Sequence, residues 1–211
     1  MNLQLQVQQL YSTDHHADLQ ALQAIPAMQR RRLSTLAKLA FNSAIQALQT
    51  YDIDYIVWAS HFGDEQKTLN ILQDVLQGHT PSPTQFSTSV HNAIAGLYSI
   101  LYQDATPSTS LSCSWSEAVV EAYAFLKTHP TAQRALVVYY DAPLPDVYEG
   151  VNRFDAFSVA AVLSLAEPNV QFDPVLKIET SHQPPEQDAQ EFLQFWQTGT
   201  PQSASGKWQR C

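Results

Sequence analysis

Strand-like and helix-like segments alternate along this chain, and their order limits the folds open to it. Leu3, Leu5 and Val7 alternate with polar residues, which is the period-two pattern of a strand with one buried face. Residues 55–58 are apolar throughout, as expected of a central strand that is covered on both faces. Because helical segments lie between the strands, the order predicts an α/β fold in which helices cover a sheet.

The other expected elements follow from residue spacing. Apolar residues recur at three- and four-residue steps over residues 26–49, which predicts a helix with Pro26 in its first turn. Residues 115–129 are apolar on nearly every side, so this helix is expected to be covered either by the tail of the chain or by another chain. Further helices are expected at residues 67–76, 87–102 and 187–197, further strands at residues 108–114, 135–140, 157–165 and 175–179, and an irregular end after residue 197.

Composition and charge exclude several classes of protein. Of 211 residues, 45% are hydrophobic and 15% are charged, which is typical of a globular chain and predicts one domain over residues 1–211. Eleven Lys and Arg against 20 Asp and Glu give a net charge of −9, so nucleic acid is not an expected partner. The apolar runs are too short to span a membrane, and residues 1–10 lack the apolar block of a signal peptide, so a cytoplasmic location is expected.

Metal, disulfide and nucleotide chemistry find little support in the sequence. Cys113 and Cys211 are the only cysteines, and both are expected to be reduced thiols. His15 and His16 lack a third ligand at metal spacing and are interpreted as part of a polar loop. The glycines form no phosphate-binding pattern, so neither a metal nor a cofactor is expected.

Residues 82–100, SPTQFSTSVHNAIAGLYSI, carry the most specific pattern in the chain. Ser89-Val-His-Asn92, Ala95-Gly96 and Pro107-Ser108 resemble the segment that precedes the nucleophilic cysteine in the β-ketoacyl synthase family. Residues 135–141 and 156–165 resemble the strands that follow in that family. With the terminal Trp-x-Arg, the chain is most similar to the short, synthase-like chain-length factors. The resemblance implies a thiolase-like N-terminal half, with a mixed, mainly parallel sheet covered by helices.

Trp115 stands where the family has its nucleophile. An ungapped count from Ala95-Gly96 into the helix at residues 115–129 places Trp115 at that position, and tryptophan offers no nucleophile. His182 is the only histidine after His129, so the histidine motifs of the family are absent from this sequence. The resemblance therefore implies a vestigial pocket without catalysis, for which the expected lining residues are Trp115, Ser114, Ser116 and Tyr98, with His91 and Asn92 nearby.

The resemblance also implies partners. A chain-length factor works beside a full-length synthase in type II fatty-acid or polyketide synthesis, and aryl polyenes are one product class of such systems. The family's strand before the nucleophile pairs across a dimer axis, and the matching residues here are Ser108, Thr109, Ser110, Leu111 and Ser112. Arg30, Arg31 and Arg32 form the one basic cluster of an acidic chain and are a candidate docking site for acyl carrier protein, with a solvated helix face as the alternative.

Four other interpretations belong to the level of sequence. Cys113 lies two residues before Trp115 and is the candidate nucleophile of a small acyl-transferring enzyme, although an unpaired cysteine is more often a small buried apolar residue. A homodimeric scaffold that binds carrier protein is another possibility. His91 is interpreted as a helix histidine with local hydrogen bonds. Residues 141–145, DAPLP, end a strand and are either a functional loop or a proline-rich terminator.

Overall fold

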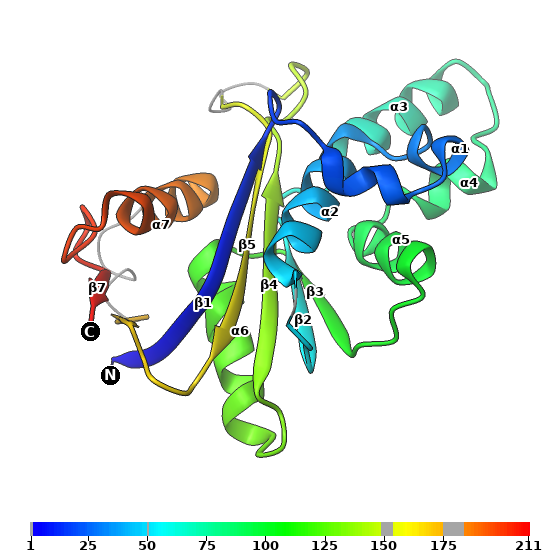
Figure 1. Cartoon of the computed structure of the whole chain (residues 1–211). Coiled ribbons are helices and arrows are strands. Elements are labelled where there is room, and N and C mark those ends of the chain that lie inside the picture. The colour runs from blue at the N-terminus through cyan, green and yellow to red at the C-terminus, as the bar shows by residue number, and fades with distance from the viewer. Residues whose placement is uncertain (1, 50, 149–153, 175–183) are drawn as a thin grey trace.

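A computed structural model of the chain describes residues 2–49, 51–148, 154–174 and 184–211. Its centre is a seven-stranded sheet in the order β3-β2-β4-β5-β1-β6-β7, with helices on both faces (Figure 1). The strands are β1 (Leu3–Asp14), β2 (Tyr55–Ala59), β3 (Ser108–Leu111), β4 (Arg134–Asp141), β5 (Phe157–Ser164), β6 (Val170–Phe172) and β7 (Trp208–Arg210). The helices are η1 (Gln20–Ala24), α1 (Ala27–Arg30), α2 (Thr35–Leu48), α3 (Glu65–Leu76), α4 (Pro83–Ser87), α5 (Ala93–Tyr102), α6 (Trp115–Thr128) and α7 (Pro185–Thr198).

The sheet is mixed, as predicted, but it is not mainly parallel in its pairings. Strand β2 pairs in parallel with β3 and β4. The other four pairings in the described part of the chain, β4 with β5, β5 with β1, β1 with β6 and β6 with β7, are antiparallel. For β4 and β5 the reason is connectivity: no crossover helix is described between these two neighbouring strands, and strands joined without a crossover return antiparallel.

Two separate cores lie on the two faces of the sheet. On one face, α2 and α5 cover Ile56, Trp58 and other side chains of the central strands. On the other face, α6 and α7 cover Val57 and Val137. Strands β2 and β5 are buried along their whole length, which confirms that residues 55–58 form a central strand covered on both faces.

Two predicted helices differ from the structure in their bounds. The helix expected over residues 26–49 is broken between α1 and α2, because the Ser34 side chain accepts a hydrogen bond from the Ala37 backbone N–H (3.1 Å) and so starts a new helix. The helix expected over residues 87–102 begins only at Ala93 as α5, because residues 88–92 form turns and Ser87 ends the preceding helix α4. Ser82 and Gln85 form a reciprocal capping box at the start of α4 and fix that helix upstream of the predicted start.

The C-terminal end is more ordered than the sequence suggested. Helix α7 confirms the helix expected at residues 187–197, and β7 replaces the expected irregular end by pairing with β6. The strand predicted at residues 175–179 lies outside the described residues. Figure 1 shows α7 and β7 at the side of the sheet opposite β3, with α7 lying next to the start of α6. The helix at 115–129 is therefore covered by the tail of the chain itself at its first turns.

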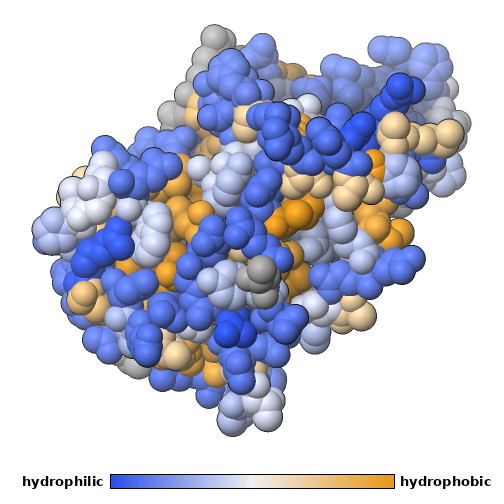
Figure 2. All heavy atoms as spheres, viewed as in Figure 1, coloured by the Kyte–Doolittle hydropathy of each residue, from blue (hydrophilic) through white to orange (hydrophobic). Residues whose placement is uncertain are grey.

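None of the described helices is long and apolar enough to cross a membrane. The face seen in Figure 2 is mainly hydrophilic, and apolar side chains reach it in smaller areas. The exposed large apolar residues include several on α3, α4 and α5: Leu72, Val75, Leu76, Phe86 and Ile100. These helices therefore carry apolar surface that the described chain does not cover.

Candidate functional site

The start of α6 is the place where the sequence predicts a vestigial site. Helix α6 follows β3 through a short loop, so its first residue lies at the edge where the parallel strands β2, β3 and β4 end. Ser114 precedes the helix, and its backbone N–H and hydroxyl both donate to Glu117 Oε2, at 2.7 and 2.8 Å. Trp115 is the first helical residue and is completely buried. In α/β proteins, binding sites commonly lie at this edge of the sheet.

Aromatic side chains fill the space beside Trp115. The ring centroid of Trp115 lies 5.0 Å from that of Phe192 on α7. Phe192 in turn lies 4.5 Å from Trp208 on β7, and Trp208 stacks at 4.3 Å on Phe172 of β6. These four residues, called the aromatic cluster below, are each at most 1% exposed. The tail of the chain therefore packs directly against the start of α6.

A buried carboxylate accepts hydrogen bonds from Ser116 at the start of α6. Asp188 of α7 accepts hydrogen bonds from the Ser116 backbone N–H at 2.7 Å and from the Ser116 hydroxyl at 2.8 Å. The Lys207 ammonium lies 2.9 Å from the same carboxylate, and all three residues are buried. A helix start attracts an anion because its first N–H groups lack partners within the helix. Asp188 satisfies that requirement from within the chain, so these donors are not available to a substrate oxygen.

Cys113 lies close to this site but is a poor nucleophile. Burial raises the pKa of its thiol to about 12, and the carboxylates of Glu117, Glu121 and Asp188 act in the same direction. A reactive cysteine needs the opposite setting, in which positive charge lowers the pKa so that the thiolate forms. The geometry therefore argues against an acyl-transferring enzyme based on Cys113.

A buried polar group at the same edge of the sheet was only partly visible in the sequence. Asp141, the last residue of β4, accepts hydrogen bonds from the Tyr139 hydroxyl at 3.0 Å and from the Ser60 hydroxyl and the His61 backbone N–H at 3.3 Å. Burial raises the pKa of the Asp141 carboxyl, while these donors act to lower it. The sequence signal was an acidic residue directly after an apolar strand, but its donors come from distant positions.

The structure separates two residues that the sequence analysis placed in one pocket. Tyr98 packs against Trp58, with ring centroids 5.0 Å apart, in the core beneath α2 and α5. Trp115 belongs to the core on the opposite face of the sheet. Tyr98 therefore does not line a common pocket with Trp115, Ser114 and Ser116.

The remaining predicted residues of the pocket have local roles. His91 lies in a turn, not in a helix as expected, and its Nε2 lies 3.0 Å from the Ser60 carbonyl oxygen. Its ring packs against Gly63, which has a φ of +69° and where any Cβ would lie 3.3 Å from the ring. Asn92 is exposed and immediately precedes α5. Neither residue comes to the start of α6 in a way that supplies a base there.

Strand β3 presents an unpaired edge in the described part of the chain. Ser108–Leu111 form the outermost strand and pair with β2 alone. The Ser112 hydroxyl donates to the His61 carbonyl at 2.7 Å and fixes the end of this strand. The edge residues are exposed or half-buried, so their outward backbone groups are accessible to a further strand.

The basic cluster is divided between two hollows. Arg30 and Arg31, together with Lys38, line a hollow of about 580 Å³. Arg32 instead lines a neighbouring hollow of about 560 Å³ between α1, α3, α4 and α5. Among the described residues, no group of His, Cys, Asp and Glu is arranged to hold a metal ion.

The fold and the start of α6 define a class of protein. A mixed sheet between two helical layers, with a buried helix that starts at the carboxyl edge of the parallel strands, is a thiolase-like fold. Residues 4–209 match the family model described as β-ketoacyl synthase, N-terminal domain. The chain belongs to that family.

Solved structures show the same fold. A ketosynthase in complex with its chain length factor from Xenorhabdus doucetiae contains a chain that matches with a TM-score of 0.82 and 23% identity, over 99% of this chain and 100% of that one. The ishigamide ketosynthase/chain length factor matches with a TM-score of 0.55 and 14% identity, over 75% of this chain and 52% of that one. A type II polyketide synthase acyl-carrier protein in complex with its ketosynthase matches with a TM-score of 0.54 and 13% identity, over 81% of this chain and 67% of that one. No curated protein matches the sequence.

Proposed function

We propose that this chain is a non-catalytic, synthase-like subunit, a chain length factor, that pairs with a full-length ketosynthase in type II fatty-acid or polyketide synthesis. The observation that carries the proposal is the closed start of α6. Trp115 stands where the resemblance places the family's nucleophile, the aromatic cluster fills the adjoining space, and Asp188 accepts a hydrogen bond from the Ser116 backbone N–H. The similar solved structure from Xenorhabdus doucetiae is described as a ketosynthase in complex with its chain length factor, which supports the same role here.

The open edge of β3 is the proposed centre of the pairing surface. A strand of four residues covers much less than the roughly 800 Å² per partner that stable complexes bury. Helix α5 packs next to β3, and the exposed apolar residues of α3–α5, among them Leu76, Phe86 and Ile100, extend the surface that a partner could cover. Pairing along β3 would add backbone hydrogen bonds, and the helices would add apolar area.

Carrier-protein docking is a second part of the proposal. Arg30, Arg31 and Lys38 gather around one hollow of a chain whose net charge is −9, so an acidic partner meets its positive charge there. One of the similar structures is described as an acyl-carrier protein in complex with its ketosynthase. Docking at these residues predicts a strong salt dependence, because exposed charges are screened at moderate ionic strength.

A single-residue change can remove an outward hydrogen-bond donor of β3 and leave the hydrogen bonds between β2 and β3 in place. The Ile56 and Ser60 backbone N–H groups donate to the Pro107 and Leu111 carbonyls, so in this parallel register the Ser110 N–H faces away from β2. Ser110→Pro removes that outward donor, and proline is tolerated on edge strands. Ser110→Ala is the matched control, since it keeps the N–H.

The experiment is co-elution of each variant with a full-length ketosynthase from the same genome, at micromolar concentration. The wild type and Ser110→Ala are expected to elute as a heterodimer, and Ser110→Pro as separate chains with its own unfolding temperature retained. Separate elution of the wild-type pair would count against the proposal. If the wild type instead forms only a dimer with itself that Ser110→Pro disrupts, the homodimeric scaffold is favoured.

A further inference from the structure

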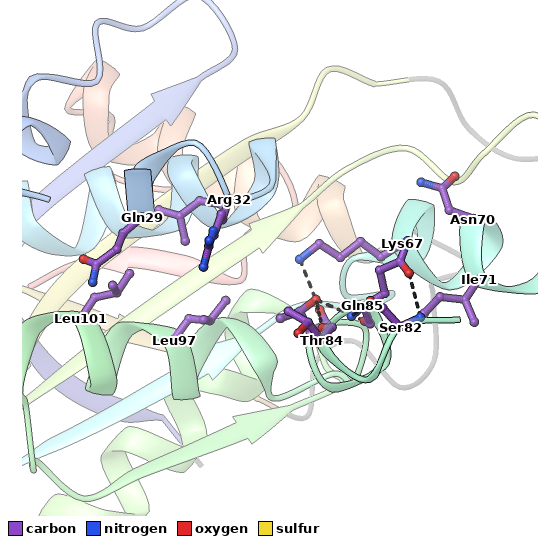
Figure 3. A pocket seen from close by; sticks show the side chains of 12 residues that line it. Gln29, Arg32, Lys67, Asn70, Ile71, Ser82, Thr84, Gln85, Leu97 and Leu101 are labelled. Carbon is purple, nitrogen blue, oxygen red and sulfur yellow. Dashed lines mark hydrogen bonds between the residues drawn. The ribbon is translucent and has the colours of Figure 1, made fainter. Parts of the chain in front are cut away.

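We propose that the hollow between α1, α3, α4 and α5 binds a small amphipathic anion, that is, an apolar body that carries one carboxylate or phosphate group. The cavity has a volume of about 560 Å³. That size lies within the range of roughly 300–1,000 Å³ typical of small-molecule sites. Figure 3 shows side chains from all these segments converging on it. The proposal does not depend on pairing with a synthase.

The interior of this hollow is apolar. Leu97 and Leu101 are four residues apart on α5, so both point from the same face of that helix into the space (Figure 3). Leu33, which is buried, and Ile71 of α3 complete the apolar lining. Half-buried apolar side chains that surround an open space of this size favour a ligand with an apolar body.

The polar groups on the α4 side already have partners. The Thr88 hydroxyl donates to the Thr84 carbonyl at 2.9 Å. Ser82 and Gln85 bond each other's backbone N–H groups in the capping box, at 3.0 and 3.1 Å. These bonds within α4 and its flanking turns occupy the Thr88 hydroxyl proton and the acceptor oxygens of Ser82 and Gln85, so part of the hydrogen-bonding capacity on this side is already used.

Two cations supply the polar end of the site. Arg32 and Lys67 enter from different segments and reach towards the space above Leu97 (Figure 3). The Lys67 ammonium donates to the Thr88 carbonyl at 3.3 Å and lies 3.5 Å from the Asp64 carboxylate, so its charge is partly compensated. The Arg32 guanidinium is exposed and meets no hydrogen-bond acceptor or carboxylate in the described ranges.

The charge balance of the hollow is the reverse of that of the chain. The whole sequence carries 20 acidic against 11 basic residues, yet none of the described residues that line this hollow is acidic. A concave site with one sign of charge and apolar walls concentrates ligands of the opposite sign. Arg32 can hold a carboxylate or a phosphate through two parallel N–H donors. The position of Arg32 thus selects an anionic head group, and Leu97 and Leu101 select the apolar body.

The site is separate from the closed start of α6. Leu97 and Leu101 pack against the core beneath α2 and α5, and Trp115 belongs to the core across the sheet. Helices α3 and α4 contain no buried residue, so little of their packing is supplied by the chain itself. A ligand that contacts α1, α3 and α5 together is therefore expected to stabilise this part of the molecule by binding only the folded form.

The test is isothermal titration calorimetry of the full chain with four probes: decanoate, decyl phosphate, decan-1-ol and decyltrimethylammonium. Decanoate or decyl phosphate is expected to bind with one-to-one stoichiometry and at least about tenfold more tightly than the neutral and cationic probes, because a charge-assisted hydrogen bond is lost with either. The tighter of the two anions identifies the head group.

Variants place the binding at this hollow. Arg32→Gln is expected to weaken anion binding about tenfold, whereas the matched control Arg31→Gln, one residue away and outside this lining, is expected to change it less than twofold. Leu97→Trp is expected to abolish binding by filling the cavity. Equal binding of all four probes, an equal loss in Arg31→Gln and Arg32→Gln, or no binding of either anion would overturn the proposal. If Leu97→Trp does not fold, the comparison of Arg32→Gln with Arg31→Gln still tests the proposal.

Discussion

Replacing Trp115 by alanine tests whether its side chain is packed in the core at the start of α6 or lines an open pocket. The side chain is completely buried and its ring lies 5.0 Å from that of Phe192. Removing the indole uncovers on the order of 150–200 Å² of apolar surface, which at about 25 cal/mol per Å² corresponds to roughly 4–5 kcal/mol. Among the described residues, Trp115 Nε1 has no hydrogen-bond partner, and removing that buried donor returns about 1–2 kcal/mol.

The expected net cost of Trp115→Ala is therefore about 3 kcal/mol of unfolding free energy. With a urea m-value of about 2 kcal/mol per M, this cost lowers the midpoint by roughly 1.5 M. Trp115→Phe keeps a ring against Phe192 and also removes the unpaired donor, so it is expected to cost only about 0–1 kcal/mol. Trp196→Ala is the control, because Trp196 is only half-buried at the edge of the same region.

The assay is urea unfolding followed by far-ultraviolet circular dichroism, which does not depend on tryptophan fluorescence. The order expected for the loss of stability is Trp115→Ala above Trp196→Ala above Trp115→Phe. A cost below about 1 kcal/mol for Trp115→Ala would show that the side chain is not packed as described. Equal costs for the alanine and phenylalanine variants at position 115 would refute the packing argument, because both variants remove the unpaired donor and only phenylalanine keeps a ring against Phe192.

Three further outcomes are expected. Asp188→Asn weakens the buried pair with Lys207 and is expected to lower the free energy of unfolding by about 3 kcal/mol. The double variant with Lys207→Met is expected to lose less stability than the sum of the two single variants, because the pair is coupled. Simple additivity of the two losses in urea unfolding would contradict the coupling. At pH 8, iodoacetamide is expected to modify the exposed Cys211 long before Cys113, whose pKa is raised to about 12 by burial and by neighbouring carboxylates, and peptide mass spectrometry distinguishes the two sites. Burial raises the pKa of Asp141 above its value in the unfolded chain, so the folded form takes up a proton more readily. The wild type is therefore expected to gain stability relative to Asp141→Asn as the pH falls from 7 towards the ordinary carboxyl range. An unchanged or reversed difference in unfolding free energy between the two proteins would count against this.

The elements with strong periodicity were predictable from the sequence. The apolar run at residues 55–58 and the nearly all-apolar helix after Ser114 are both present as predicted. The three-residue strands β6 and β7 were missed, because so short a segment carries no usable period. Whether a helix lies on one face of a sheet or the other is not encoded in its own pattern, which is why Tyr98 was placed with Trp115 although the sheet separates them.

The features that close the start of α6 depend on contacts between distant residues. Trp115 could be assigned to the nucleophile position by counting along the chain. Asp188 could not be linked to Ser116, because 72 residues separate them and neither lies in a recognisable motif. The position of Lys207 beside Asp188 depends on β7, which the sequence did not predict. Long-range polar pairs of this kind are fixed by the tertiary fold and leave no local signal.

Intact-mass spectrometry of the reconstituted pair tests the central claim most directly. This chain and a full-length ketosynthase from the same genome are incubated together with an acylated carrier protein, and the mass of each chain is then measured. A chain whose helix start is closed by Trp115 and Asp188 is expected to keep its unmodified mass while the synthase gains the acyl group. An acyl adduct on this chain, at Cys113 or elsewhere, would contradict the account.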